Sequence, residues 1–217
     1  MSQAADTVRR NDIRMAECLG TLTEAQWSRP SLCTEWTNHE VLAHLVVGYS
    51  AGPASALKAT LHHRGSFDLA NAGMARTLAA HRGSQALLDD FASLTQRARG
   101  IGRVFPRRLL LGDHVIHELD ITFAVGVEST IPAEILAAVL DTEVRIPNPF
   151  VPASSLARGL TLIATDAIWS HRADGPTVEG RAAHLASTLA GRPWALQYLT
   201  GTGVSVLETR LASRQRL

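Results

Sequence analysis

Asp113 and His117 stand four residues apart in the segment PRRLLLGDHVIHELDITFAVG, residues 106–126, which has the apolar periodicity of a helix. Side chains at positions i and i+4 lie on one face of a helix, one turn apart, so this pair can bind a single ion. A carboxylate and an imidazole together suit zinc, nickel or iron(II). Two ligands on one helix make a weak site, and a third ligand must therefore come from another element.

His44 is our candidate for that third ligand. It lies among Leu42, Leu45 and Val47 in another helical segment, and a histidine on an apolar stripe needs a partner. Helix bundles build metal sites from side chains on facing helices. Three protein ligands leave at least one coordination position open, as in catalytic metal sites. That position can take water or a thiol, and a metal-bound thiol is deprotonated.

Sequence spacing does not by itself select this set. His114 and Glu118 are also four residues apart, and His114 and His117 are three apart. An acid–histidine pair at this spacing also occurs on exposed helices that hold no metal. A lone histidine such as His44 is often a hydrogen-bonded core residue.

The apolar neighbours favour one face of the helix. Asp113, His117 and Asp120 share a face that is flanked by Leu109 and Ile116, so this face is expected to point inward. We expect Asp120, on this face, to lie near the site and to orient a ligand histidine by accepting a hydrogen bond from its second ring nitrogen.

Helix signals locate the elements that must position these residues. Thr37 and Glu40 have the spacing of a capping box, which predicts the start of the helix that carries His44. Pro106 and Gly126 mark the start and end of the helix with the acid–histidine pair, and Gly112 inside it lets a neighbouring helix or a ligand come close. Helical periodicity also covers residues 4–22, 68–98 (with a break or kink at 83–84) and 132–144.

Three prolines within residues 146–152 predict a linker, because proline resists both helix and sheet. We therefore expect a helical domain over residues 1–146 and a small α+β domain over residues 153–217. In the second domain, residues 160–169 and 203–208 have strand-like patterns, and residues 181–192 have the pattern of an amphipathic helix. The expected fold class is mainly α, a helical bundle followed by a small α+β domain.

Charge and composition argue against several classes of partner. The net charge of +1 argues against a broad surface for nucleic acid or anionic membrane. We find no signal-peptide pattern and no apolar run long enough to span a membrane. Cys18 and Cys33 are too few for a disulfide framework, which favours a reduced, cytoplasmic setting. Cys33 lies in a loop near Trp36, where simple packing is favoured over a reactive thiol.

Two segments resemble a known family. The stretch WSRPSLCTEWTNHEVLAHL, residues 27–45, resembles the start of the mycothiol-dependent maleylpyruvate isomerase family of the DinB-like superfamily; the matching residues are Trp27, Pro30, Trp36, His44 and Leu45. The stretch GDHVIHELDITFAVG, residues 112–126, is similar to the family's acidic residue followed by three others and a histidine; the matching residues are Asp113, His117, Asp120 and Gly126. A weaker similarity to the family's small C-terminal domain covers residues 164–169, 175–180 and 184–192.

The resemblance implies a DinB-like four-helix bundle in which His44, Asp113 and His117 bind the metal. It implies zinc as the metal and mycothiol as the thiol cofactor. The family more often has glutamate where this chain has Asp113, and the shorter side chain leaves the identity of the metal open.

The resemblance further implies an isomerase or S-transferase that acts on a small electrophilic substrate. The thiolate would add to an electrophilic carbon and then leave in an isomerase, or stay in a transferase. Arg192, at the end of the helix expected over residues 181–192, is the candidate anchor for a substrate carboxylate, although a plain charge at a helix C-terminus fits it too. The expected partners are a small-molecule substrate and a thiol, with no nucleic acid and no membrane, in a cytoplasmic monomer or homodimer.

Three other functions stay open from the sequence. The first is a non-catalytic metal- or ligand-binding helical module that keeps the bundle without the chemistry. The second is a structural or regulatory helical protein, in which His44 and His117 are ordinary buried polar residues. The third is a hydrolase, because an open zinc site can activate water instead of a thiol.

Overall fold

The structure is a computed structural model that describes residues 3–34, 36–52, 54–55, 62, 67–97, 99–103, 105–148 and 151–214. The chain divides into two compact units: residues 1–110 with 120–128, and residues 111–119 with 129–217. Helix α7 (Arg107–Ala124) is continuous, and it contributes its two ends to the first unit and its middle to the second.

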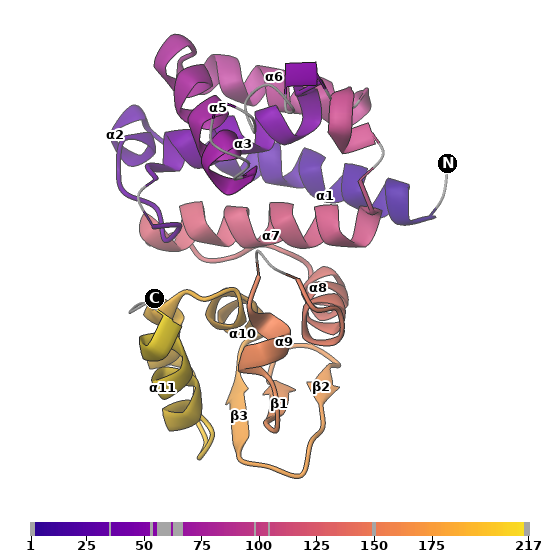
Figure 1. Cartoon of the computed structure of the whole chain (residues 1–217), viewed down its shortest axis with the longest axis vertical. Coiled ribbons are helices and arrows are strands. Elements are labelled where there is room, and N and C mark those ends of the chain that lie inside the picture. Colours follow the sequence, from indigo (N-terminus) through magenta and orange to yellow (C-terminus); the bar gives the residue numbers. More distant parts are fainter. Residues whose placement is uncertain are drawn as a thin grey trace. The chain divides into compact units, whose positions relative to one another are not determined.

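The first unit is helical. Its other elements are α1 (Gln3–Leu19), α2 (Glu24–Trp27), α3 (Asn38–Ser50), α5 (Phe67–His81), α6 (Ser84–Gln96) and the 3-10 helix η1 (Gly100–Arg103). Helix α3 packs against α5, α6 and η1, and α1 packs against α6 (Figure 1). The expected break at residues 83–84 is confirmed, since α5 and α6 are separate helices.

Helix α3 is the centre of this unit. The backbone N–H of Glu40 donates to Thr37 Oγ1 at 3.2 Å, and the backbone N–H of Thr37 donates to Glu40 Oε2 at 2.8 Å, which confirms the predicted capping box. Residues 41–47 are all buried, so this part of α3 is covered by other residues on every side. A polar side chain at position 44 therefore lies in the core.

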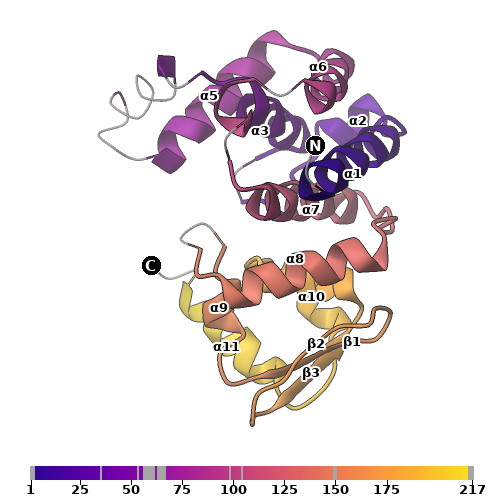
Figure 2. The same cartoon turned by 90° about the vertical axis from the view of Figure 1, so that its right-hand side faces the viewer.

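The second unit contains a small sheet and several helices. Its elements besides the middle of α7 are α8 (Ala133–Arg145), α9 (Ala153–Leu156), β1 (Thr161–Ala164), β2 (Ser170–His171), β3 (Thr177–Gly180), α10 (Ala182–Leu189), the 3-10 helix η2 (Pro193–Tyr198) and α11 (Val204–Arg214). The strand order is β2-β1-β3. Strand β1 is antiparallel to β2 and parallel to β3, with Leu162 opposite both His171 and Val178. Figure 2 shows the three strands side by side. The fold class expected from the sequence, a helical bundle followed by a small α+β region, is confirmed.

The strand expected at residues 203–208 is wrong, because this segment begins α11. The alternation at Val204 and Val206 covers too few residues to distinguish the period of a strand from that of a helix. The burial of Leu207 and Leu211, one turn apart, shows the helical period. Gly203, just before the helix, is buried against the sheet: an added Cβ would lie 2.7 Å from Val178 Cγ2.

The domain boundary expected within residues 146–152 stays a prediction. The compact units divide earlier in the chain, because α8 packs against α9 and α10. Of the expected linker, Pro149 and Phe150 lie outside the described residues.

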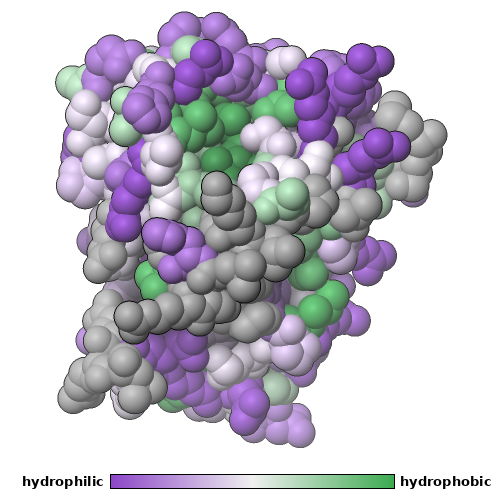
Figure 3. All heavy atoms as spheres, turned by 45° about the horizontal axis from the view of Figure 1, so that its top comes forward, coloured by the Kyte–Doolittle hydropathy of each residue, from purple (hydrophilic) through white to green (hydrophobic). Residues whose placement is uncertain are grey.

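Hydrophilic residues surround smaller areas of hydrophobic ones on the face shown in Figure 3. The large hydrophobic side chains that are exposed among the described residues are Leu69, Phe105, Ile146, Ile168 and Tyr198. Of the helices that the structure describes, none combines the length and the apolar character that crossing a membrane requires.

Candidate metal centre

Three side chains from two helices converge at the candidate site. One ligand atom from each of His44, Asp113 and His117 lies within 4.8 Å of the other two. Both histidines are buried, and Asp113 is half-buried. The residues that the family resemblance implies as ligands are therefore brought together, and their role as ligands stays a prediction.

The pair on α7 has a spacing that fits a metal ion. Asp113 Oδ1 lies 3.6 Å from His117 Nε2, one helical turn further along. Two ligand atoms bound to one tetrahedral zinc at the usual distances are about 3.4 Å apart. The pair thus needs only a small adjustment to share an ion, and its nitrogen and oxygen donors suit zinc or iron(II).

Asn71 on α5 contacts the side chain of His44, the third potential ligand. Its side-chain amide lies 3.0 Å from His44 Nδ1. A half turn of the amide places Oδ1 at that position, where it accepts a proton from Nδ1 and leaves Nε2 as the lone-pair donor that a metal requires. On another side, the Trp36 ring is tilted against the His44 ring with centroids 5.1 Å apart. The ring of His44 is therefore fixed by a polar contact and an aromatic one.

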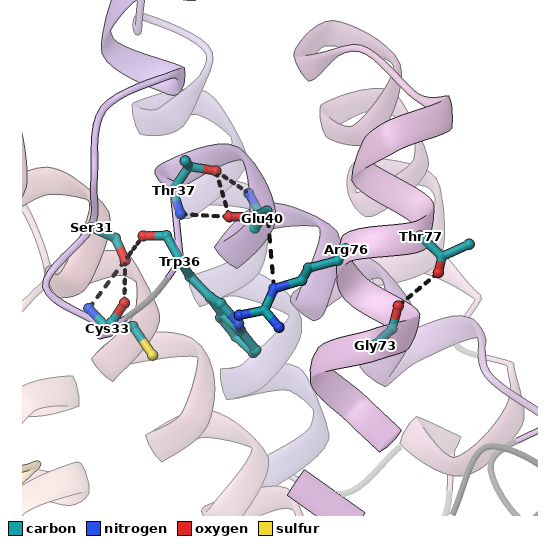
Figure 4. A network of polar contacts seen from close by, with 8 residues as sticks. All are labelled: Ser31, Cys33, Trp36, Thr37, Glu40, Gly73, Arg76 and Thr77. Atoms are coloured by element: carbon teal, nitrogen blue, oxygen red, sulfur yellow. Dashed lines mark hydrogen bonds and ion pairs between the residues drawn. The ribbon is translucent and has the colours of Figure 1, made fainter. Parts of the chain in front are cut away.

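A polar network ties α5 to the start of α3 (Figure 4). Glu40, which closes the capping box with Thr37, has its Oε1 at 3.9 Å from Arg76 Nε. Arg76 lies on the same helix as Asn71, so this ion pair and the Asn71–His44 contact join the same two helices.

The loop before α3 has its own hydrogen bonds. Ser31 Oγ lies within hydrogen-bonding distance of the carbonyl oxygens of Cys33 and Trp36, and it accepts from the backbone N–H of Cys33 at 3.1 Å (Figure 4). The backbone N–H of Leu32 donates to the carbonyl of Asp120 at 3.1 Å. These bonds fix the loop beside the C-terminal half of α7.

Cys33 belongs to a second set of potential ligands that the sequence did not predict. One atom from each of Cys33, His117 and Asp120 lies within 4.8 Å of the other two. Asp120 is fully buried, in agreement with the inward face expected for it. Its expected role in orienting a ligand histidine stays a prediction.

The alternative pair on α7, His114 and Glu118, lies on a different face of the helix from Asp113 and His117. His114 and Glu118 are both 1% exposed, yet neither belongs to a potential metal group among the described residues. The structure therefore distinguishes two faces of the helix that sequence spacing left equivalent.

Glu143 on α8 lies beside α7 within the second unit. A Cβ added to Gly112 would lie 2.5 Å from Glu143 Oε1, so the expected close approach at this glycine is confirmed. Burial raises the pKa of Glu143 from 4.5 to about 7, and the negative charge of Asp113 adds to the effect.

Arg192 follows the C-terminus of α10. Its Nη1 donates to the carbonyl of Ala190 at 2.8 Å, as expected for a cation at a helix C-terminus. The anchoring of a substrate carboxylate by Arg192 stays a prediction.

The fold and site define a class of protein, a helical bundle with a small α+β unit and a potential histidine–carboxylate metal centre. Residues 8–107 match the family model described as the mycothiol maleylpyruvate isomerase N-terminal domain, which confirms the resemblance found in the sequence. The matched residues include Cys33, His44 and Asn71 and end before Asp113.

Two solved structures align with 93% of this chain. The crystal structure of a histidine-to-alanine mutant of the mycothiol-dependent maleylpyruvate isomerase is 17% identical, with a TM-score of 0.55 over 93% of this chain and 96% of that one. A second crystal structure of the mycothiol-dependent maleylpyruvate isomerase is 18% identical, with the same coverage and a TM-score of 0.48. At this identity, the first similarity establishes the fold. No curated protein matches the sequence at a significant level.

Proposed function

We propose that the protein is a metal-dependent enzyme that uses a low-molecular-weight thiol of the mycothiol type. It would act as an isomerase or S-transferase on a small electrophilic substrate. The convergence of His44, Asp113 and His117 carries this proposal, and the family of residues 8–107 supports the choice of thiol.

The donor set supports a divalent metal, with zinc as the first choice. Two imidazole nitrogens and one carboxylate oxygen match three-ligand zinc sites that keep a position open. A divalent ion held there would lower the pKa of a bound thiol and so supply a thiolate at neutral pH.

The protein's own side chains would prepare this site. Asn71 would keep Nδ1 of His44 protonated, so that Nε2 donates its lone pair. The burial of both histidines keeps water away from their rings. Asp113 keeps 42% of its side chain exposed, so a substrate or thiol would approach from the Asp113 side.

Arg192 would anchor a substrate carboxylate, which requires guanidinium N–H groups other than the one that donates to Ala190. We also propose a cytoplasmic location and a monomeric or homodimeric state.

Calorimetry with mycothiol and S-methyl mycothiol tests the thiol part. The zinc-loaded protein is expected to bind mycothiol and release a proton, seen as a heat that depends on the buffer. S-methyl mycothiol has no thiol proton and should bind at least about 10-fold more weakly, since it cannot form a thiolate. Equal binding of both compounds would contradict the proposal and favour the non-catalytic binding module.

A further inference from the structure

Cys33 lies beside the candidate ligands on α7 without belonging to their set. Its sulfur, a ring nitrogen of His117 and a carboxylate oxygen of Asp120 lie within 4.8 Å of one another. His117 and Asp120 are 8% and 0% exposed, and Cys33 is half-buried. A thiol, an imidazole and a carboxylate thus meet in a largely dry environment.

Backbone hydrogen bonds fix the position of Cys33. Leu32, its neighbour in sequence, donates its N–H to the carbonyl of Asp120. Ser31 Oγ accepts from the N–H of Cys33. The loop is therefore attached to the same turn of α7 that carries the Asp120 side chain, and this attachment needs no bound ion.

The two sets of potential ligands differ in chemistry and share one residue. The first set offers two nitrogens and an oxygen, from His44, His117 and Asp113; the second offers a sulfur, a nitrogen and an oxygen, from Cys33, His117 and Asp120. Among the described residues, no potential metal group combines Cys33 with His44 or Asp113. Thiolate is a soft ligand that favours zinc and other thiophilic ions over magnesium or manganese.

We propose that Cys33, His117 and Asp120 form a second binding set, for a thiophilic divalent cation. A neutral imidazole has one nitrogen lone pair to donate, so His117 serves one set at a time. The chain would then hold about one ion in either of two positions, and Cys33 would bias the choice toward zinc-like ions.

Cobalt(II) titration of the metal-free, reduced protein tests this proposal, because cobalt replaces zinc and reports thiolate ligands by absorption in the near ultraviolet. We expect this thiolate-to-cobalt band in the parent protein, with saturation at about one cobalt per chain. Cys33→Ser should remove the band, and Cys18→Ser should keep it. Cys18 is a matched control, because it is also half-buried and belongs to no potential metal group among the described residues.

The same titration separates this proposal from the proposed function. A band that survives in His44→Ala and disappears in Cys33→Ser would support the second set independently of the first. Cobalt bound to the parent without a thiolate band would overturn the second set and leave the first intact. A parent protein that binds no cobalt would overturn both.

Thiol alkylation gives a second measurement that does not depend on a spectrum. In His44→Ala, where only the second set is complete, zinc should slow the reaction of Cys33 with iodoacetamide at least about 10-fold, since a metal-bound thiolate is a poorer nucleophile. Cys18 in the same sample should react at an unchanged rate, as tandem mass spectrometry can determine. Equal rates for Cys33 with and without zinc would overturn the proposal.

Discussion

The side-chain amide of Asn71 on α5 lies 3.0 Å from Nδ1 of His44 on α3, and these two residues are 27 positions apart in the sequence. In metal sites, a partner on the second ring nitrogen fixes the tautomer and orientation of the ligand histidine. Asn71 is therefore expected to act on the metal through His44 without touching it.

Replacement of Asn71 tests this positioning role. Asn71→Ala should weaken zinc binding by about 10–100-fold, whereas Asn71→Asp should retain affinity, because a carboxylate also accepts the Nδ1 proton. Competition with a chromogenic chelator measures both values. Thr77→Ala, at an exposed position of the same helix, should leave affinity unchanged. Equal losses in Asn71→Ala and Asn71→Asp would contradict the role.

The elevated pKa of Glu143, about 7, predicts a specific dependence of stability on pH. Between about pH 4.5 and 7 the unfolded chain gives up the carboxyl proton while the folded protein keeps it. The free energy of unfolding should therefore fall as pH rises through this range and level off above it.

Glu143→Gln should remove this decline. The free energy of unfolding of the variant minus that of the parent should be about 1–3 kcal/mol larger at pH 8 than at pH 4.5. Urea unfolding of the metal-free protein at both pH values measures the difference, with chelator present because an ion near Asp113 would change the balance. Glu208→Gln, at an exposed site on α11, is the control. The same pH dependence in Glu143→Gln and the parent would contradict the account.

We expect the capping box of α3 to contribute to stability without a direct effect on metal binding. Thr37→Ala should lower the free energy of unfolding by about 1 kcal/mol, because the N–H of Glu40 loses its acceptor. Denaturant unfolding measures the loss, and Thr37→Ser should recover most of it. A zinc affinity that falls in parallel would show instead that the start of α3 also positions His44.

Local signals in the sequence predicted the elements that carry the site. The Thr37 capping box and the glycine at position 126 lie where α3 and α7 begin and end. The strand prediction for the segment after Gly203 was wrong because six residues fit both the strand period and the helix period. Only the burial of Leu211, further along the chain, identifies the helix. The sequence pattern was thus sufficient to predict the fold class. The secondary structure of a short ambiguous segment could be assigned only from its tertiary contacts.

The site was accessible from the sequence only in part. The family resemblance brought His44 together with Asp113 and His117, which spacing alone could not do. Asn71 and the metal-binding potential of Cys33 were missed, because contacts between separate elements leave no spacing signal. The position of Cys33 depends on a backbone hydrogen bond from Leu32 to Asp120, which sequence patterns do not encode.

We propose that His44, Asp113 and His117 bind one metal ion, and mass spectrometry of the purified protein can measure its metal content. After incubation with zinc and removal of the excess, the parent protein and His81→Ala, an exposed control, should each retain about one zinc per chain. In a Cys33→Ser background, where only the first set can hold the ion, His44→Ala and His117→Ala should retain far less zinc. Their circular dichroism spectra should remain those of the folded protein. A parent protein without bound zinc, or a His117→Ala variant with full zinc content, would contradict the account.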